Sequence, residues 1–478
     1  MPTGFDQYEM LPTTWFYVSA IIILAIFFKF NRFWSVRNFD LICLIFLTPG
    51  LLLVAGWNDV TGYIWLFCVQ GLLVVRLLFD TIMVRRPLLE PNLSSEGLTF
   101  SCFFLVFFVI AALLVNRGER IAVNTVRLEQ IITARHIHNK IGMNPDTLTI
   151  SPSEWDNLPP GFRPFLVLTE RANLAFAPPS HIQKEITGAT VHFPDTGSVM
   201  VAAETPPSSV LMPTTKPITV EEPPITSDKS ASLHPELNVW FLVLTLIIVG
   251  HLVVVLEFAY IGYRHFGKLQ TGIACAALYL FHPYSNQMIG RLDHVIPAAL
   301  LLWSVAAYRR PLFAGFGIGA AAALVWYPLW LIPLWCGFYR QKGWIRFLCG
   351  AVLSFIVFVV LLCFSSPEWG TFAEQLIHMG GKTAFMIFSQ PDGFWTADDM
   401  FYRMPVLAVF VTVCVGSLLV PSHKHLATLI GGSALLMIGV QFFQLYQGGL
   451  YLSWYLPLLI LTVFRPNLED RTARAAVV

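Results

Sequence analysis

Thirteen apolar runs, separated by short polar corners, constrain the fold of this chain more than any other feature. With 56% hydrophobic and only 12% charged residues, the chain has about half the charge of an average globular protein, which is typical of a protein built for lipid. Several runs are shorter than the ~20 residues that a helix needs to cross a bilayer. We therefore predict an all-α polytopic membrane protein with about 13 transmembrane or half-membrane helices. The runs cover approximately residues 15–28, 41–56, 62–79, 98–115, 239–258, 270–281, 295–307, 312–325, 327–338, 347–363, 404–420, 426–445 and 449–464.

Lysine and arginine residues gather in every second loop between these runs. Short cytoplasmic loops collect such residues, so the pattern predicts which loops face the cytoplasm. The opposite loops, which include residues 116–237, 282–294 and 365–402, are much poorer in basic residues. We predict a multi-pass protein of the cell (plasma or inner) membrane with its N-terminus outside and its C-terminus cytoplasmic. The residues assigned to the cytoplasmic side are Lys29, Arg32, Arg37, Arg85, Arg86, Arg264, Lys268, Arg309, Arg310, Arg340, Lys342, Arg346, Lys424, Arg465 and Arg471.

Charge and cysteine content argue against two classes of function. The net charge is +1, and the basic residues lie in short clusters rather than on one face, so we expect no nucleic-acid partner. All eight cysteines fall in apolar runs, which supports neither a disulfide framework nor a CxxC metal site. Any chemistry is therefore expected in the polar corners between the runs.

The long polar segment between the fourth and fifth runs divides into two parts. Residues 116–202 combine a helix cap at Ser151-Pro152-Ser153-Glu154 with the strand-like pieces PFLVLT and ATVHF, and predict a small α+β extracytoplasmic insert. Residues 203–237 are rich in Pro, Ser and Thr and predict a flexible tether. The expected domains are N-terminal membrane helices over 1–115, the insert, the tether, a C-terminal membrane core over 238–465 and a cytoplasmic tail over 466–478.

The stretch 312–339 has two possible arrangements. One long helix would move the basic residues that follow it to the outer side and invert every later loop. A pair of half-helices that turns at Trp326-Tyr327-Pro328 keeps the charge pattern, and irregular backbone inside a membrane is tolerated where it lines a cavity. We therefore predict the pair. The glycines at 315, 317 and 319 suit close helix packing.

The corner at 282–294 holds the sharpest candidate for chemistry. Asp293 lies at the outer end of a span. An isolated carboxylate at such a position must be hydrated, form an ion pair or take part in function. Arg291 and His294 offer either a structural ion pair or a phosphate-binding site, and His282 lies at the start of the same corner. A helix-end Asp is also an ordinary cap, so Asp293 is a catalytic candidate and its three neighbours are candidates for substrate binding.

Several motifs follow one another in the C-terminal half. They are Gly290-Arg291-Leu292-Asp293, an apolar span, Arg-Arg-Pro, then LFAGFGIGAAAALVWYPLWLIP, and finally YQGGLYLSWYLPLLILTVFRP. In this order, over roughly residues 238–465, they resemble the polyprenol-phosphate-mannose-dependent branch of the membrane glycosyltransferase C superfamily. Arg291 stands where that family usually has Gln, and Trp326, followed by Tyr327, stands where it usually has Lys. The resemblance implies a site for a lipid-linked sugar at these corners.

The catalytic base is open between Asp293 and two residues of the N-terminal half, Glu119 and Asp59. In that family the base is an Asp in the first extracytoplasmic loop, just after the first core span. If this span is 98–115, the residues that follow it offer Glu119; if it is 41–56, Asp59 fits, with Tyr63 four residues on. Order along the chain favours Glu119, and chemistry favours Asp59. The implied partners are a polyprenyl-phosphate sugar, the bilayer and a glycan, lipid or protein acceptor.

The 365–402 loop adds further candidates. Lys382 and, just after the loop, Arg403 are expected to meet a lipid head group or an acceptor, although a solvated interfacial loop would hold the same residues. Asp398 and Asp399 could hold a divalent cation, but two adjacent carboxylates without further ligand spacing are weak evidence. We therefore assign no metal ligand and no certain cofactor.

Aromatic and histidine residues in the spans have both structural and functional interpretations. Trp454 and Tyr455 are candidates for sugar binding, and an interfacial aromatic belt would explain them equally well. For His251, in the middle of a span, we expect a hydrogen bond between helices rather than a proton relay.

Three functions remain in consideration. The first is a glycosyltransferase that moves a sugar, mannose-like by the resemblance, from a polyprenyl-phosphate donor to an extracytoplasmic acceptor. The second is a transporter or lipid flippase, against which the low charge of the span interiors and the lack of an obvious repeat both count. The third is a catalytically inactive membrane scaffold that presents the 116–237 segment. The first is the working prediction.

Overall fold

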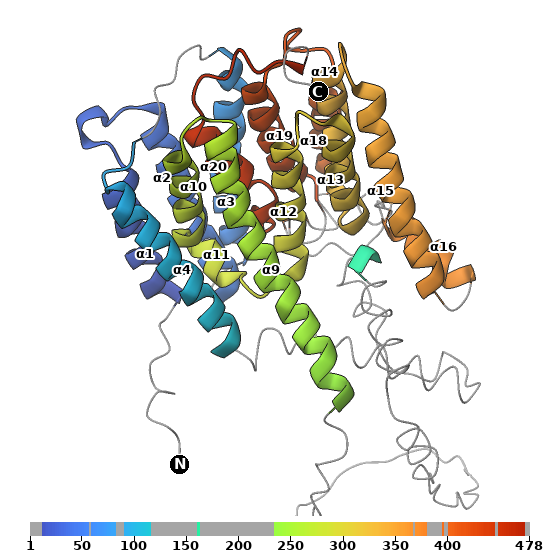
Figure 1. Ribbon diagram of the computed structural model, residues 1–478, viewed down its shortest axis with the longest axis horizontal. Helices are drawn as coiled ribbons and strands as arrows, with labels where there is room; N and C mark the ends of the chain where they lie inside the picture. Colours follow the sequence, from blue (N-terminus) through green and yellow to red (C-terminus); the bar gives the residue numbers. More distant parts are fainter. Residues whose placement is uncertain are drawn as a thin grey trace, which may run out of the picture.

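The computed structural model describes residues 12–56, 59–82, 90–115, 160–162, 234–366, 369–379, 394–395, 400–444 and 448–473, and these parts are predominantly helical (Figure 1). Every one of the thirteen predicted apolar runs coincides with a helix, or with a 3-10 turn and the helix after it. The predicted α+β insert lies outside the described residues, apart from the turn η4. The elements are α1 (Pro12–Phe27), η1 (Phe30–Arg32), α2 (Val36–Gly56), α3 (Asp59–Leu78), η2 (Phe79–Ile82), α4 (Ser95–Val115), η4 (Pro160–Phe162), α9 (His234–Arg264), α10 (Leu269–Phe281), α11 (Pro283–Gln287), α12 (Leu292–Ala306), α13 (Pro311–Leu324), η5 (Tyr327–Leu331), α14 (Ile332–Tyr339), α15 (Trp344–Ser365), α16 (Trp369–Met379), α18 (Met400–Gly416), α19 (Leu426–Gln441), η6 (Leu452–Trp454) and α20 (Leu456–Phe464).

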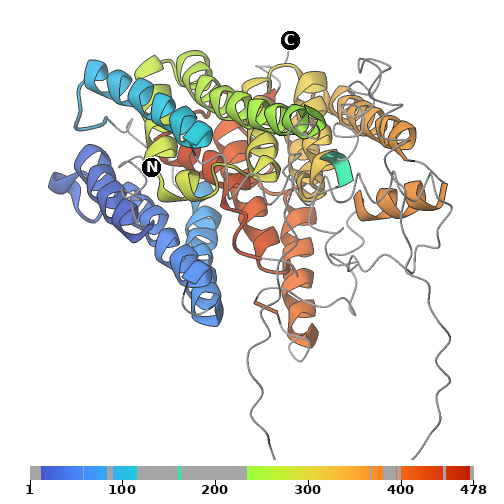
Figure 2. The same cartoon turned by 90° about the horizontal axis from the view of Figure 1, so that it is seen from below.

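Five of these helices are long and apolar enough to cross a membrane, and several shorter apolar helices pack among them. The spans in α4 and α15 bury only 22% and 28% of their apolar windows inside the protein. Phe100, Phe103, Phe104 and Phe107 are exposed along α4, which lies with α9 along one side of the bundle (Figure 2). Apolar faces of this size do not suit water, so the surroundings that fit this bundle are a lipid bilayer.

The predicted pair of half-helices is confirmed by the packing of α13 and α15. A Cβ atom at Gly315 or Gly319 would overlap the backbone oxygens of Phe347 or Ala351, and one at Gly350 would overlap that of Leu312. The two helices therefore run side by side in the same direction with their backbones in contact. Because α13 and α15 run in the same direction, the chain between the end of α13 and the start of α15 has to cross back to the other side of the bundle. The segment formed by η5 and α14 makes this crossing.

This contact predicts a large effect of a single methyl group. Gly315→Ala should lower the stability of the protein by about 1–3 kcal/mol, because the added Cβ must push the backbones of α13 and α15 apart. Gly416→Ala is a matched control, since a Cβ at this helical glycine meets nothing within 4 Å. Thermal unfolding in detergent should show a lower midpoint for the first variant and an unchanged or higher one for the second; equal midpoints would contradict the close packing.

The helix ends divide the bundle into two sides. The helix α14 lies at the upper side in Figure 1, whereas α11 and the start of α9 lie toward the lower side. From the insert, η4 packs against α16, and Gly161 lies against the backbone of Ala323 and Leu324 at the end of α13. Residues 160–162 therefore contact the bundle beside the turn that begins at Trp326.

Two histidines of α9 and its end make hydrogen bonds between helices. His251 bonds through Nε2 to the Ile289 oxygen at 3.1 Å and through Nδ1 to the Tyr279 hydroxyl at 3.2 Å, as expected for a structural histidine. His265, just after α9, lies 2.8 Å from the Ala306 oxygen through Nε2. Both join α9 to neighbouring segments of the C-terminal core.

His265 predicts a loss of stability in acid. Burial lowers the pKa of His265 from 6.5 to about 4, and Arg309 and Arg264 act in the same direction. Between these two pKa values the unfolded chain binds a proton that the folded protein excludes, so stability should fall as the pH drops from 7 to 5, by about 2 kcal/mol for this group. When the pH is lowered from 7 to 5, the melting temperature of His265→Gln should fall less than that of the wild type. The control is His423→Gln, a change at an exposed histidine, whose melting temperature should fall as much as that of the wild type.

Candidate functional site

The candidate site begins at the corner between α10 and α12. The chain leaves α10, forms the single turn α11, and enters α12 with Asp293 in its first turn. The Arg291 guanidinium donates two hydrogen bonds to the Asp293 carboxylate, from Nη2 to Oδ2 at 2.8 Å and from Nε to Oδ1 at 3.2 Å. Asp293 is 8% exposed, whereas the Arg291 side chain keeps 31% of its surface exposed. The acid is therefore held in place, and the cation beside it remains accessible.

His294 connects this pair to the C-terminal segment. Its Nδ1 makes a short hydrogen bond with the Tyr284 hydroxyl of α11, and its backbone oxygen accepts a bond of 2.9 Å from the Ser453 hydroxyl of η6. Its Nε2 is buried without a hydrogen-bond partner among the described residues and lies 3.7 Å from Oδ2 of Asp293. The Tyr284 hydroxyl also donates to the Ser453 hydroxyl at 3.4 Å. The His294 tautomer with its proton on Nε2 directs that proton toward the Asp293 carboxylate, which is the electrostatically favourable arrangement.

A cluster of aromatic rings covers the same corner. The Trp454 ring stacks on Tyr451, with centroids 4.4 Å apart, and meets Tyr327 at 4.3 Å. Tyr327 in turn meets Trp326 at 4.2 Å, and Tyr451 lies 5.3 Å from the His294 ring. The Trp454 indole also donates to the Asp293 backbone oxygen at 3.2 Å. Rings from η5 and η6 thus lie directly against the start of α12.

Six predicted site residues therefore lie in one place, although they come from three separate stretches of the chain. Nothing in the sequence specified a distance between the 282–294 corner, the turn at 326–328 and the closing aromatic segment. The structure shows that the three meet through hydrogen bonds and ring contacts. The residues brought together are Asp293, Arg291, His294, Trp326, Tyr327 and Trp454.

Three other candidates are used in other contacts. His282 is fully buried; its Nε2 bonds to the Leu44 oxygen at 3.0 Å, and its Nδ1 caps α11 by accepting from the backbone of Tyr284. The Tyr455 hydroxyl accepts from Gln70 of α3 at 3.1 Å. Arg403 donates from Nε to the Phe443 oxygen at 2.6 Å, and is close enough to interact electrostatically with Tyr327. Arg403 therefore lies near the rim of the aromatic cluster, whereas His282 and Tyr455 join helices.

The side chains of the two candidates for the base in the family-like position lie outside what the structure describes. Asp59 is the first residue of α3, and nothing further of its side chain is described. Glu119 and Lys382 lie outside the described residues. Asp293 is thus the catalytic candidate whose surroundings are defined.

Sequence reasoning missed Tyr284 and Ser453 as members of this site. Both lie in polar corners already singled out, Tyr284 in HPYSNQ and Ser453 in YLSWY. Their only signal was this position, because a tyrosine or serine at a membrane boundary is common. Their contacts with His294 depend on how α11 and η6 meet in space.

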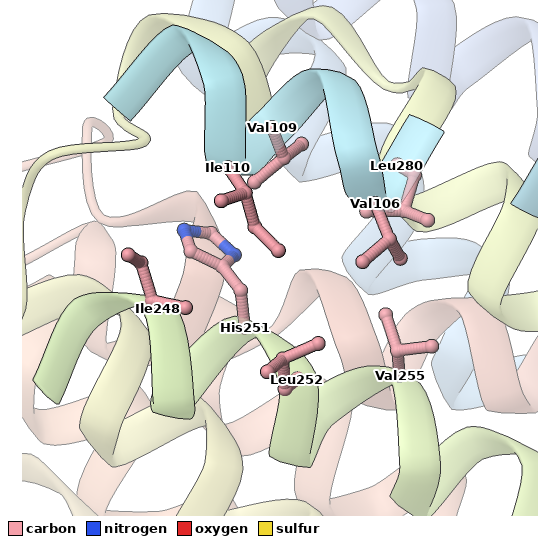
Figure 3. A pocket seen from close by; sticks show the side chains of 8 residues that line it. All are labelled: Val106, Val109, Ile110, Ile248, His251, Leu252, Val255 and Leu280. Carbon is pink, nitrogen blue, oxygen red and sulfur yellow. The ribbon is translucent and has the colours of Figure 1, made fainter. Parts of the chain in front are cut away.

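A small apolar cavity between α4, α9 and α10 is separate from this site (Figure 3). Seven aliphatic side chains and His251 line it, and its volume of about 10 Å³ leaves room for roughly one water molecule. It is too small and too apolar to hold a sugar. In the part of the chain that the structure describes, no group of three or more His, Cys, Asp or Glu residues is arranged to hold a metal ion.

The site therefore combines a buried carboxylate, an accessible guanidinium, an imidazole and a wall of aromatic rings at one end of a helical bundle. Such a set can bind a phosphate through the guanidinium, stack a sugar ring and accept a proton from a hydroxyl group. No known family model, curated protein or solved structure matches the chain.

Proposed function

We propose that this protein is an integral membrane glycosyltransferase that moves a sugar from a polyprenyl-phosphate donor to an extracytoplasmic acceptor. The observation that carries the proposal is the meeting of the Arg291–Asp293 pair with the aromatic cluster of Tyr327, Tyr451 and Trp454. A lipid-linked sugar needs a cation for its phosphate, a flat apolar wall for its ring and a carboxylate near the incoming hydroxyl. The three kinds of group occur here within contact of one another.

The proposed orientation places this site outside the cytoplasm. The corner lies at the side of α11, and the basic loops assigned to the cytoplasm follow the opposite ends of the helices. The positive-inside rule then supports an outer site, with the N-terminus outside and the C-terminus cytoplasmic. A donor whose lipid tail lies in the bilayer would present its anomeric carbon at this level.

The reaction follows from the two charged groups. Asp293 accepts the proton of the acceptor hydroxyl as its oxygen forms a bond to the anomeric carbon, and the bond from that carbon to the phosphate oxygen breaks. The phosphate leaves on the polyprenyl chain, and Arg291 stabilises its charge. Arg291 neutralises Asp293 in the unliganded protein, so binding of the phosphate would draw the guanidinium away and leave the carboxylate free to act as a base. General-base assistance contributes about 10²–10⁴-fold, and stabilisation of developing charge is often the larger effect.

The test is transfer of labelled sugar by the purified protein in liposomes. Polyprenyl-phosphate mannose and polyprenyl-phosphate glucose are the donors, and release of unlabelled polyprenyl phosphate reports the reaction whatever the acceptor. The variants Asp293→Asn, Asp59→Asn and Glu119→Gln identify the base. Full activity in all three would contradict the mechanism.

A second candidate, the inactive membrane scaffold, is favoured by the same ion pair. Two hydrogen bonds to Arg291 and deep burial are also what a purely structural corner would show. In that case the wild type transfers no sugar from any donor tested, and Arg291 and Asp293 affect stability alone.

A further inference from the structure

A second charged cluster lies at the other end of the bundle: Arg465 directly follows the end of α20, whereas Trp454 of the candidate site precedes its start. Nε of Arg76, in the last turn of α3, donates to Asp40 of α2 at 2.5 Å, and its Nη1 donates to Asp80 of η2 at 2.6 Å. Arg465, directly after α20, forms an ion pair with the other oxygen of Asp80. Arg37, one turn before Asp40, lies within electrostatic reach of Asp40 and Arg465. We call these five residues the basic cluster.

Four members of the basic cluster are buried and Arg37 is half-buried, and each of the three arginines keeps a buried donor without a partner among the described residues. Arg76 is 6% exposed and Arg465 is 5% exposed. Nη2 of Arg76, Nε of Arg465 and Nη2 of Arg37 are buried without a hydrogen-bond partner among the described residues. Native proteins rarely leave buried donors unpaired, because each lost hydrogen bond is unfavourable, most of all for a charged group. Three such donors on three neighbouring guanidinium groups point to a shared acceptor.

The charges lead to the same conclusion. Among the described members of the cluster, three guanidinium groups face two carboxylates, and the excess positive charge is on the half-buried Arg37. A positive charge that is partly removed from water favours an anionic partner. Asp40 and Asp80 fix the planes of Arg76 and Arg465, which prearranges the remaining donors. Guanidinium groups match the several oxygens of a phosphate better than they match a single-atom anion.

We propose that Arg37, Arg76 and Arg465 bind a phosphate group at the end of the bundle that the basic loops assign to the cytoplasm. The cluster joins the start of α2, the end of α3 and the end of α20, where the apolar spans meet the polar boundary. Two molecules reach this position and carry the same group: an anionic lipid with its phosphate, and free inorganic phosphate. Either would tie the N-terminal helices to the C-terminal one, independently of sugar transfer.

The experiment is thermal unfolding of the full chain in detergent. In one arm inorganic phosphate is added, and sodium chloride at equal ionic strength is the control. In the other arm phosphatidic acid is added, and phosphatidylcholine is the control. A phosphate that binds only the folded protein raises its melting temperature in proportion to the logarithm of its concentration. A rise in the first arm identifies free phosphate as sufficient, and a rise in the second arm alone identifies a lipid head group.

The variant Arg37→Gln removes one unpaired donor and leaves the ion pairs of Arg76 and Arg465 intact. The concentration for a half-maximal shift should rise about tenfold in Arg37→Gln, and less in Arg37→Lys, which keeps the charge but not the planar fork. Arg310→Gln removes an exposed charge from the same end and should respond as the wild type. A melting temperature no higher than that with sodium chloride or phosphatidylcholine, or an unchanged response in Arg37→Gln, would overturn the proposal.

Discussion

Asp80→Asn is expected to destabilise the protein by about 3–5 kcal/mol, because it removes one member of a buried ionic network, leaves Arg465 without its carboxylate and leaves Arg76 with the carboxylate of Asp40 alone. Asp80 receives hydrogen bonds from Arg76 and from Arg465, and the second of these joins residues that are 385 positions apart along the chain. Its carboxylate fits against Gly431 of α19, where a Cβ would lie 3.1 Å from Oδ2. The loss should appear as a lower midpoint of thermal unfolding in detergent.

The matched control is Asp470→Asn near the C-terminus. The Asp470 side chain is 72% exposed and pairs with Arg471 at 3.2 Å, an arrangement that contributes at most about 1 kcal/mol. Replacing Asp80 and Arg465 together by leucine should cost less than the sum of the two single changes, since removing both partners leaves fewer unpaired charges. Equal midpoints for Asp80→Asn and Asp470→Asn would show that the network does not hold the two ends of the chain together.

The helices were well predicted from the sequence because their signal is local. An apolar run is visible in the sequence wherever its helix packs, and each of the thirteen runs coincides with a helical segment, five of which are long and apolar enough to cross a membrane. The half-helix pair was also predictable, since one long helix would have reversed the side of Arg340 and every later basic residue. Charge counting along the chain therefore identified a turn that apolarity alone did not show.

The ionic network was not predictable, because its partners are joined only by tertiary structure. Asp40, Arg76 and Asp80 lie in or beside apolar spans, whose composition predicted interiors almost free of charge. Glu257 of α9 is a further exception: it is 7% exposed, and neither carboxylate oxygen has a hydrogen-bond partner among the described residues. Nothing in the sequence indicates that a carboxylate in one helix and a guanidinium in another are neighbours in the folded protein.

The candidate site was predictable in composition and not in arrangement. The corners that hold Asp293, Tyr327 and Trp454 were each identified from unusual polar or aromatic residues at the ends of apolar runs. Predicted sidedness placed the 282–294 corner on the outer side, but nothing in the sequence predicted that the three corners touch. The contacts of His294 with Tyr284 and Ser453 needed the meeting of α11, α12 and η6. The contacts of His282 were not predictable for the same reason, because its bond to Leu44 crosses to a helix of the N-terminal half.

Asp293→Asn is expected to lower the rate of sugar transfer by about 10²–10⁴-fold, because the amide cannot accept the proton of the acceptor hydroxyl. The change keeps the size of the side chain and its place at the start of α12. It also removes the partner of Arg291, but that side chain is 31% exposed and can be hydrated, so the loss of stability should be much smaller than for Asp80→Asn. Initial rates of donor consumption and the melting temperature, measured on the same preparation, separate the two effects.

Two further variants, Arg291→Gln and Asp470→Asn, show how much of the lost rate of sugar transfer in Asp293→Asn is due to the missing base. Arg291→Gln should weaken use of the donor, since the phosphate loses its cation, and it frees the Asp293 carboxylate rather than removing it. Asp470→Asn changes the same functional group at the opposite end and should leave the rate unchanged. A wild-type rate in Asp293→Asn combined with a large loss in Asp59→Asn or Glu119→Gln would move the base to the N-terminal half of the chain. Asp293 would then act by holding Arg291 in position for the phosphate, and Arg291→Gln would remain impaired.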